Sequence, residues 1–367
     1  MIALRRIAAI ARVELLRLMR SRTTFTLLIL VPALQLLLFG FAIRPTAASV
    51  SVAVAAPTTA NAADAARALR RLPGLTVVTG PSSPGAAEKA VRAGRALIGV
   101  EVPALRSFAN PTQVQHPLRI VVDGTNVALT NTAVARIEAG YWRGLAERAD
   151  VVDSGPGIAI ERLYNPDGRA DWTFLPALIG VTVMIAMVML GSLSLARDRE
   201  SGSWEGLLGL PLAPTETFLG KLLPYAAIGT VQGLLVLAAG VMMFDLPARG
   251  SVVALIAMLP LFASAHVALG YAISVRARTQ LAALQGAVAF YLPAMLLSGF
   301  LYPFETLPAW AQWIGNAFPL THFIRAAREA LLRDAGATEV LAHAWPMILF
   351  LIVATGSALL TSARQFD

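Results

Sequence analysis

The chain contains no cysteine among its 367 residues. It therefore forms no disulfide, carries no thiolate nucleophile and builds no cysteine metal site. Charged residues are also scarce, at 14% of the sequence, where a soluble domain has about 25%. Hydrophobic residues make up 56%. This balance predicts a polytopic membrane protein.

The formal net charge is +8, which in a soluble protein would suggest a nucleic-acid partner. Here the basic residues cluster beside apolar segments, as the positive-inside rule expects of cytoplasmic loops. The charge therefore indicates membrane topology, and no nucleic acid is expected as a partner.

Residues 1–22 are expected to form a cytoplasmic amphipathic helix on the membrane surface. Apolar residues recur at spacings of three and four along one face: Leu4, Ile7, Ala11, Leu15 and Leu18. The opposite side carries Arg5, Arg6, Arg12, Arg17 and Arg20. Arginine stems can snorkel from such a helix to anionic lipid headgroups. A merely basic tail before the membrane is the alternative.

Residues 23–43 are predicted to form the first transmembrane helix, because the run is long enough for a hydrocarbon core of about 30 Å. It exceeds the roughly 7–15 apolar residues of a cleavable signal, so it should stay as an anchor.

Residues 44–171 read as an extracytoplasmic α/β domain, large enough for a core of its own. Strands are predicted at 50–55, 75–80, 96–102 and 118–126. Helices are predicted at 61–72, 84–96 and 127–150.

Residues 172–367 are predicted to form a five-helix transmembrane module, which makes six spans in all. The five spans are placed at 173–196, 222–243, 251–275, 280–300 and 342–362. A cytoplasmic helix is expected within 198–212 and an outer re-entrant or surface-lying hairpin at 301–320. The charge pattern predicts a protein of the bacterial inner membrane with both termini in the cytoplasm. The segment 321–341 fits this charge pattern least well.

The five carboxy-terminal spans carry no Asp, Glu, Lys or Arg in their interiors. A charge held there usually serves an ion or proton pathway, so an ion-coupled carrier is disfavoured. Of the polar interior residues, only His266 titrates near neutral pH, and it is expected to make a helix–helix hydrogen bond. Gly229 and Gly233 predict close helix packing.

Motifs of known enzyme classes are incomplete or absent in the sequence. Gly220-Lys221 resembles the end of a phosphate-binding loop, but Thr215 and Leu222 stand where that loop needs Gly and Ser or Thr. The sequence contains no His-Glu-x-x-His and no Gly-x-Ser-x-Gly motif. The chain is therefore not expected to be an enzyme, and energy for uphill transport must come from another polypeptide.

The segment RDRESGSWEGLLGLPLAPTETFLGK, residues 197–221, is the natural entry point for that energy. Ser201, Gly202 or Ser203 can cap a short helix whose apolar edge contains Trp204. An amphipathic helix of this kind suits a groove on a motor subunit. The residues alone favour a simpler alternative, a loop whose arginines only set topology.

Three stretches carry a family resemblance. ARDRESGSWEGLLGLPLAPTETFLGKLLPY, SGFLYPFETLPAWAQWIGNAFPLTHFIRAARE and LYNPDGRADWTFLPALIG resemble segments of type-2 ABC transporter permeases. Ser203 departs from the threonine usual in that family, and residues 316–319 differ around its usual Asn-Pro.

The resemblance implies the membrane subunit of an ABC exporter that moves a drug-like, lipid-like or other hydrophobic compound. It implies a second permease subunit, identical or paralogous, and separate ABC ATPase subunits that bind ATP and Mg²⁺. It also suggests a periplasmic adaptor protein, with no cofactor on this chain.

Two sets of site residues follow. Candidate coupling residues are Arg199, Glu200, Gly202, Ser203, Trp204, Glu205, Leu208, Pro211, Glu216 and Lys221. Candidate residues along the translocation path are Phe290, Tyr291, Met295, Phe300 and Tyr302.

Two other functions remain as alternatives. One is an extracytoplasmic sensor or assembly scaffold with a polytopic anchor, although six spans exceed what an anchor needs. The other is the ion-coupled carrier.

Overall fold

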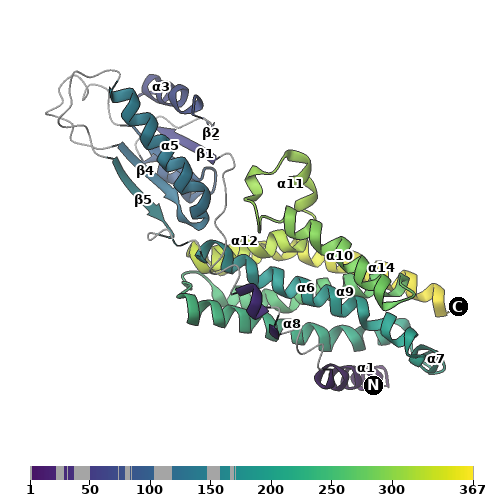
Figure 1. Ribbon diagram of the computed structural model, residues 1–367. Coiled ribbons are helices and arrows are strands. Elements are labelled where there is room, and N and C mark those ends of the chain that lie inside the picture. The colour runs from purple at the N-terminus through teal and green to yellow at the C-terminus, as the bar shows by residue number, and fades with distance from the viewer. Residues whose placement is uncertain are drawn as a thin grey trace. The chain divides into compact units, whose positions relative to one another are not determined.

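The structure is a computed structural model that describes residues 2–21, 29–30, 32–36, 50–72, 74–78, 83, 85–102, 118–146, 158–165, 169 and 171–366. The chain divides into two compact units. One combines Met1–Ile43 with Phe174–Asp367, and the other is Arg44–Thr173 (Figure 1). The predicted first span, 23–43, lies mostly outside the described residues.

The Arg44–Thr173 unit contains a five-stranded sheet in the order β2-β1-β3-β4-β5. Its strands are β1 (Val50–Ala55), β2 (Leu75–Val78), β3 (Ile98–Glu101), β4 (Leu118–Asp123) and β5 (Ile158–Leu163). β1 is parallel to β2 and β3, β4 is antiparallel to β3, and β5 is parallel to β4. The helices are α3 (Thr59–Arg70), α4 (Ala86–Arg92) and α5 (Val127–Ala146). The four predicted strands and three predicted helices are thus confirmed. β1 has the predicted bounds, α3 begins two residues before its predicted start, and β5 was not predicted.

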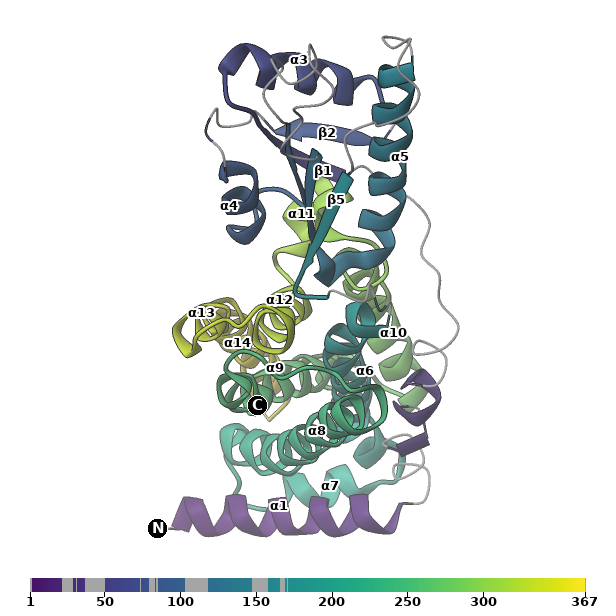
Figure 2. The same cartoon turned by 90° about the vertical axis from the view of Figure 1, so that its left-hand side faces the viewer.

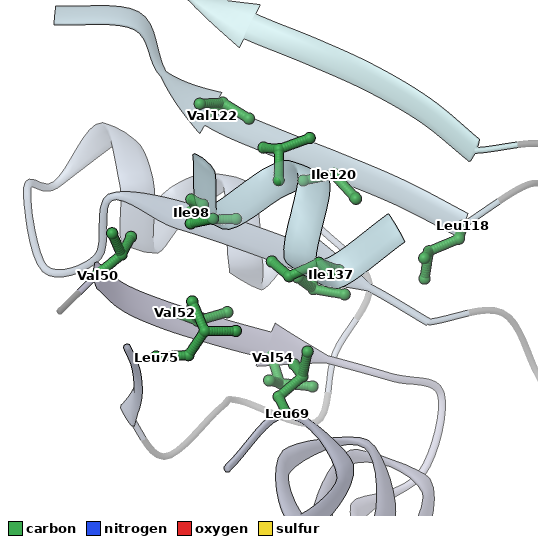
Figure 3. Packing of buried hydrophobic residues seen from close by; sticks show 13 residues of the cluster. Val50, Val52, Val54, Leu69, Leu75, Ile98, Leu118, Ile120, Val122 and Ile137 are labelled. Carbon is green, nitrogen blue, oxygen red and sulfur yellow. The ribbon is translucent and has the colours of Figure 1, made fainter. Parts of the chain in front are cut away.

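Helices cover both faces of this sheet because the strands are apolar on both sides. Val52, Ile98 and Ile120 are fully buried on the face that also receives Ile137 of α5 (Figure 3). The opposite face packs against α4, where Gly99 permits a close approach. A Cβ atom at Gly99 would lie 2.8 Å from the carbonyl oxygen of Ala87.

The other unit is helical. Five helices among the described residues are long and apolar enough to cross a membrane. They are α6 (Asp171–Glu200), α8 (Pro214–Phe244), α9 (Val252–Arg276), α10 (Gln280–Leu297) and α14 (Ala344–Phe366), the last extended at its start by α13 (Ala337–Ala342). They correspond to the five predicted carboxy-terminal spans. α8 begins well before the predicted 222, because Pro214 and Glu216 start a helix.

α6 is the central helix of this unit. In an apolar stretch of 18 residues within α6, 83% is buried inside the protein. The corresponding share is only 17% for α10 and for Ala337–Ser362. Glycines let α8 pack closely against its neighbours, as predicted. A Cβ atom at Gly229 would meet Met187 of α6, and one at Gly233 would meet Leu259 of α9.

The segment predicted as a hairpin contains the 3-10 helix η4 (Phe304–Thr306) and α11 (Ala309–Gly315), followed by α12 (Pro319–Leu332). The helix α12 was not predicted, because Arg325, Arg328 and Glu329 interrupt its apolar pattern. Each of these charged side chains has a partner nearby in space that comes from another segment of the chain. Arg325 lies 4.5 Å from the Phe304 ring centroid, Arg328 donates to the Gly299 carbonyl, and Glu329 contacts His343.

The amino-terminal segment forms the expected helix, α1 (Ile2–Arg20). Figure 2 shows it running alongside α8. Leu18 is buried, but Leu4 and Leu15 are exposed, so only part of the apolar face contacts the protein. Lipid contact for the exposed part stays a prediction.

Candidate coupling site between α6 and α8

The link between α6 and α8 contains one short helix, α7 (Ser203–Leu208). It is shorter than the predicted 198–212, because α6 continues to Glu200. Gly202 has φ +68°, a left-handed conformation that glycine adopts easily at a helix end. The Ser201 and Ser203 hydroxyls lie 2.7 Å apart, and Ser201 also donates to the Asp198 carbonyl. This turn sets the direction in which α7 leaves α6.

Arg199 and Glu200 fasten the end of α6 to the α9–α10 connection. Arg199 Nη1 donates to the Ala277 carbonyl at 2.7 Å. The Glu200 carboxylate accepts from the backbone and side-chain nitrogens of Gln280, the first residue of α10. A carboxylate is favourable there, because the start of a helix carries partial positive charge. The two residues therefore join three membrane helices at one point.

Trp204 connects α7 to this junction. The Arg199 guanidinium carbon lies 5.3 Å from the Trp204 ring centroid, within cation–π range. Trp204 is half-buried, and Gly206, Pro211 and Leu210 after it are exposed. Glu205 and Leu208 occupy α7, with side chains outside the described part of the chain. Trp204 is thus linked through Arg199 to the α9–α10 connection.

Glu216 and Lys221 lie behind this surface. Glu216 Oε2 accepts from the Ala213 backbone nitrogen at 3.0 Å, which satisfies a free N–H at the start of α8. Arg6 of α1 lies 3.5 Å from the same carboxylate. The Lys221 side chain is only 2% exposed. Both side chains are therefore largely inaccessible to a docking protein.

Lys221 belongs to a buried charge cluster that also contains Glu14, Arg17 and Asp198. Its ammonium group contacts the Glu14 carboxylate, lies 2.7 Å from Asp198 Oδ2 and donates to the Ser194 carbonyl at 3.1 Å. These three acceptors satisfy all three of its protons. Arg17 Nη1 lies 2.7 Å from Asp198 Oδ1 and 3.5 Å from Glu14. Two carboxylates and two cations thus balance.

The environment of Arg17 shows how strongly the cluster holds its charges. Burial by itself would lower the pKa of Arg17, but the carboxylates of Glu14 and Asp198 outweigh burial and raise it. The sequence analysis missed this cluster. One signal was present: Glu14 is the only acidic residue among residues 1–22, in a helix that otherwise carries arginines.

The proposed path residues do not share one environment. Tyr291 and Met295 on α10 are half-buried, and Tyr302 is exposed. Phe290 packs edge-on against Phe318 at 5.5 Å. Phe300 is 1% exposed, so it lies within the subunit.

His266 does not make the expected helix–helix hydrogen bond. Its Nδ1 lies 2.8 Å from the Phe262 carbonyl of the same helix, and its Nε2 has no partner among the described residues. Rings of Phe262, Phe290 and Phe350 surround it. Other polar side chains do join helices: Thr182 of α6 donates to Gln35 at 2.8 Å, and Ser274 of α9 accepts from the Leu195 backbone nitrogen of α6 at 2.9 Å.

Comparisons with known proteins agree with the sequence resemblance. The chain is 29% identical to "Probable multidrug ABC transporter permease YbhR" of Escherichia coli K12, over 98% of each chain. It is 25% identical to "Probable multidrug ABC transporter permease YbhS" of the same organism, over 99% of this chain and 98% of YbhS. "Inner membrane transport permease YhhJ" is 32% identical over 58% of this chain and 56% of YhhJ.

A family profile described as "ABC-2 family transporter protein" matches residues 22–360, which include α6, α8, α9, α10 and all but the last residues of α14. The chain therefore belongs to the ABC-2 transporter family and is a membrane subunit of an ABC exporter.

Proposed function

We propose that an ABC ATPase subunit docks against α7 and drives export through this chain. The observation that carries the proposal is the attachment of α7, whose half-buried Trp204 contacts Arg199, which in turn bonds the α9–α10 connection. A rigid, partly exposed helix between two membrane helices is suited to receive a mechanical stroke. In this proposal ATP and Mg²⁺ bind the partner, and this chain needs no cofactor of its own.

The translocation path is proposed to form between two permease subunits, identical or paralogous. Apolar side chains on α10 and α14 are exposed in the single subunit, among them Leu281, Leu292 and Ile352. These surfaces must meet either lipid or a second subunit. Phe290, Tyr291, Met295 and Tyr302 are accessible enough to line such a path, whereas the buried Phe300 would need side-chain rearrangement.

The proposed cargo is a hydrophobic compound, drug-like or lipid-like. Two relatives of nearly equal length, YbhR and YbhS, are named as probable multidrug permeases. Apart from Gln280 and Gln285, the residues of α10 that are not buried are apolar or aromatic, which fits cargo of that class. The Arg44–Thr173 unit is proposed to lie outside the inner membrane, where a periplasmic adaptor would contact it.

Cysteine labelling tests the proposed topology, because the chain has no natural thiol. Ala68→Cys and Ala213→Cys are matched substitutions at exposed positions, one on α3 and one before α8. In intact cells the first should react with a membrane-impermeant maleimide, and the second only after the membrane is opened. The reverse pattern would overturn the placement of the termini in the cytoplasm.

Reconstitution tests the proposed transport. The chain is placed in proteoliposomes with its ATPase partner and a fluorescent hydrophobic compound, and efflux is measured with ATP. We expect efflux only with ATP and an active ATPase, and none with an ATPase whose catalytic glutamate is replaced. Efflux driven by a proton gradient alone would establish the carrier instead. ATPase binding without any cargo movement would favour the scaffold.

A further inference from the structure

The Gly220-Lys221 pair, which fails as a phosphate-binding loop, forms the seat of α1 on α8. A Cβ atom at Gly220 would lie 2.6 Å from Ile10 Cβ and 3.3 Å from the Ile7 carbonyl oxygen. Real Cβ atoms do not approach other atoms as closely as the first distance, so only glycine allows this contact without a shift. The next residue, Lys221, reaches from the same place on α8 to Glu14 of α1.

The charges around this seat specify one position of α1 along α8. Glu14 and Asp198 are 4% and 6% exposed in their side chains, so water cannot replace a lost partner. Breaking a buried ion pair leaves an uncompensated charge, which is strongly unfavourable. Sliding α1 by one helical turn would separate Glu14 from both Lys221 and Tyr225. A second pair, Arg6 with Glu216, supports the same register.

The cluster and α7 are close to each other in the sequence. Asp198 precedes Arg199 and Glu200, which hold α7 to the α9–α10 connection. Arg17 and Lys221 both bond Asp198, so α1, the end of α6 and the start of α8 meet at one carboxylate.

We propose that α1 is a fixed part of the coupling unit and moves as one rigid body with the α6–α7–α8 segment during each ATP cycle. The inference rests on the proposed coupling through α7. Glu14, Arg17, Asp198 and Lys221 act as positioning residues, which hold α1 and α7 in one arrangement. A helix that only floated on the membrane surface would need neither a buried carboxylate nor a glycine seat.

A disulfide between α1 and α8 tests this directly. In the variant Ile10→Cys/Gly220→Cys the only two thiols of the chain face each other. A disulfide has a Cβ–Cβ distance of about 3.5–4.5 Å, so a shift of roughly 1 Å suffices. The variant is assembled with its ATPase, oxidised with diamide, and its ATP-driven efflux is compared before and after reduction. Each single-cysteine variant is the matched control for oxidation.

We expect the disulfide to form with and without bound ATP, and efflux to stay within about twofold of the reduced protein. A disulfide that forms in only one nucleotide state, or fails to form in the folded variant, would overturn the rigid-body proposal. So would a fall in efflux of about tenfold that reduction restores. Absence of efflux from the unmodified protein would count against the proposed function, and the two failures are therefore distinct.

A triple variant that lacks the charges of Glu14, Asp198 and Lys221 separates positioning from folding. Glu14→Gln/Asp198→Asn/Lys221→Met removes three charges together and leaves Arg17, whose side chain is 35% exposed and can reach water. We expect this variant to bind the ATPase and hydrolyse ATP, but to move about tenfold less cargo per ATP. Lys221→Arg should keep most transport, because it restores the cation. If this triple variant moves as much cargo per ATP as the unmodified protein, the cluster serves folding alone.

Discussion

Replacing Trp204 by alanine is expected to weaken docking of the ATPase subunit by about 2 kcal/mol, roughly 30-fold, and to reduce ATP-driven efflux. Buried tryptophans are typical energetic centres of interfaces. Trp204 is half-buried on α7, and its ring is held by the Arg199 guanidinium. Removing the ring therefore takes away both a contact surface and the link from α7 to α9. Affinity is measured with the solubilised subunit and a labelled ATPase.

The matched control is Trp310→Ala. Trp310 lies on α11 and is 63% exposed, so the same side chain is removed away from the coupling site. We expect ATPase affinity to be unchanged in this variant. Equal effects of the two substitutions, or normal affinity and efflux in Trp204→Ala, would contradict a docking role for α7. Glu205→Lys offers a second test on the same helix, with reversed charge.

Gly270→Ala is expected to destabilise the membrane unit by about 1–3 kcal/mol, although alanine is the better helix former. A Cβ atom at Gly270 would lie 2.5 Å from the Val188 carbonyl oxygen and 2.8 Å from the Ser192 nitrogen. Both are backbone atoms of α6, so no side chain can move aside. The two helices must separate, and the dense packing between them is lost. Thermal unfolding in detergent measures the change.

Gly356→Ala on α14 provides a control with the opposite expected sign. A Cβ atom there has no neighbour within 4 Å, so the substitution meets open space. Alanine should then stabilise the helix by about 0.5–1 kcal/mol through its higher helix propensity. Destabilisation by both variants would mean that an effect common to the two substitutions, and not the α6–α9 contact, dominates.

Much of the secondary structure could be predicted because its signals are local. Apolar runs of sufficient length identified the five carboxy-terminal spans, and short runs rich in apolar and β-branched residues identified β1 to β4. β5 was missed because its Ile158–Leu163 segment includes Glu161 and Arg162, and only pairing with β4 establishes it as a strand. α12 was missed because its charges are acceptable only beside partners from other segments.

The candidate site was predictable in part for the same reason. Arg199, Glu200 and Trp204 were identified from one continuous stretch of sequence, and the structure brings them together through the α9–α10 connection. Lys221 was assigned to the same stretch, and its partner Asp198 lies there too, but its other carboxylate partner is distant in the chain. Its nearest acceptor, Glu14, is 207 residues away.

By itself the sequence determined a cysteine-free membrane protein with short loops, a separate α/β segment and no charge within its carboxy-terminal spans. Hydrophobicity, helix length and motif spacing are properties of neighbouring residues, so they are visible before folding. Only the tertiary structure decided that Glu14, Asp198 and Lys221 form one buried cluster, and that Gly220 receives α1. Buried charges are stable only when partners from separate helices meet, and that meeting is a consequence of packing.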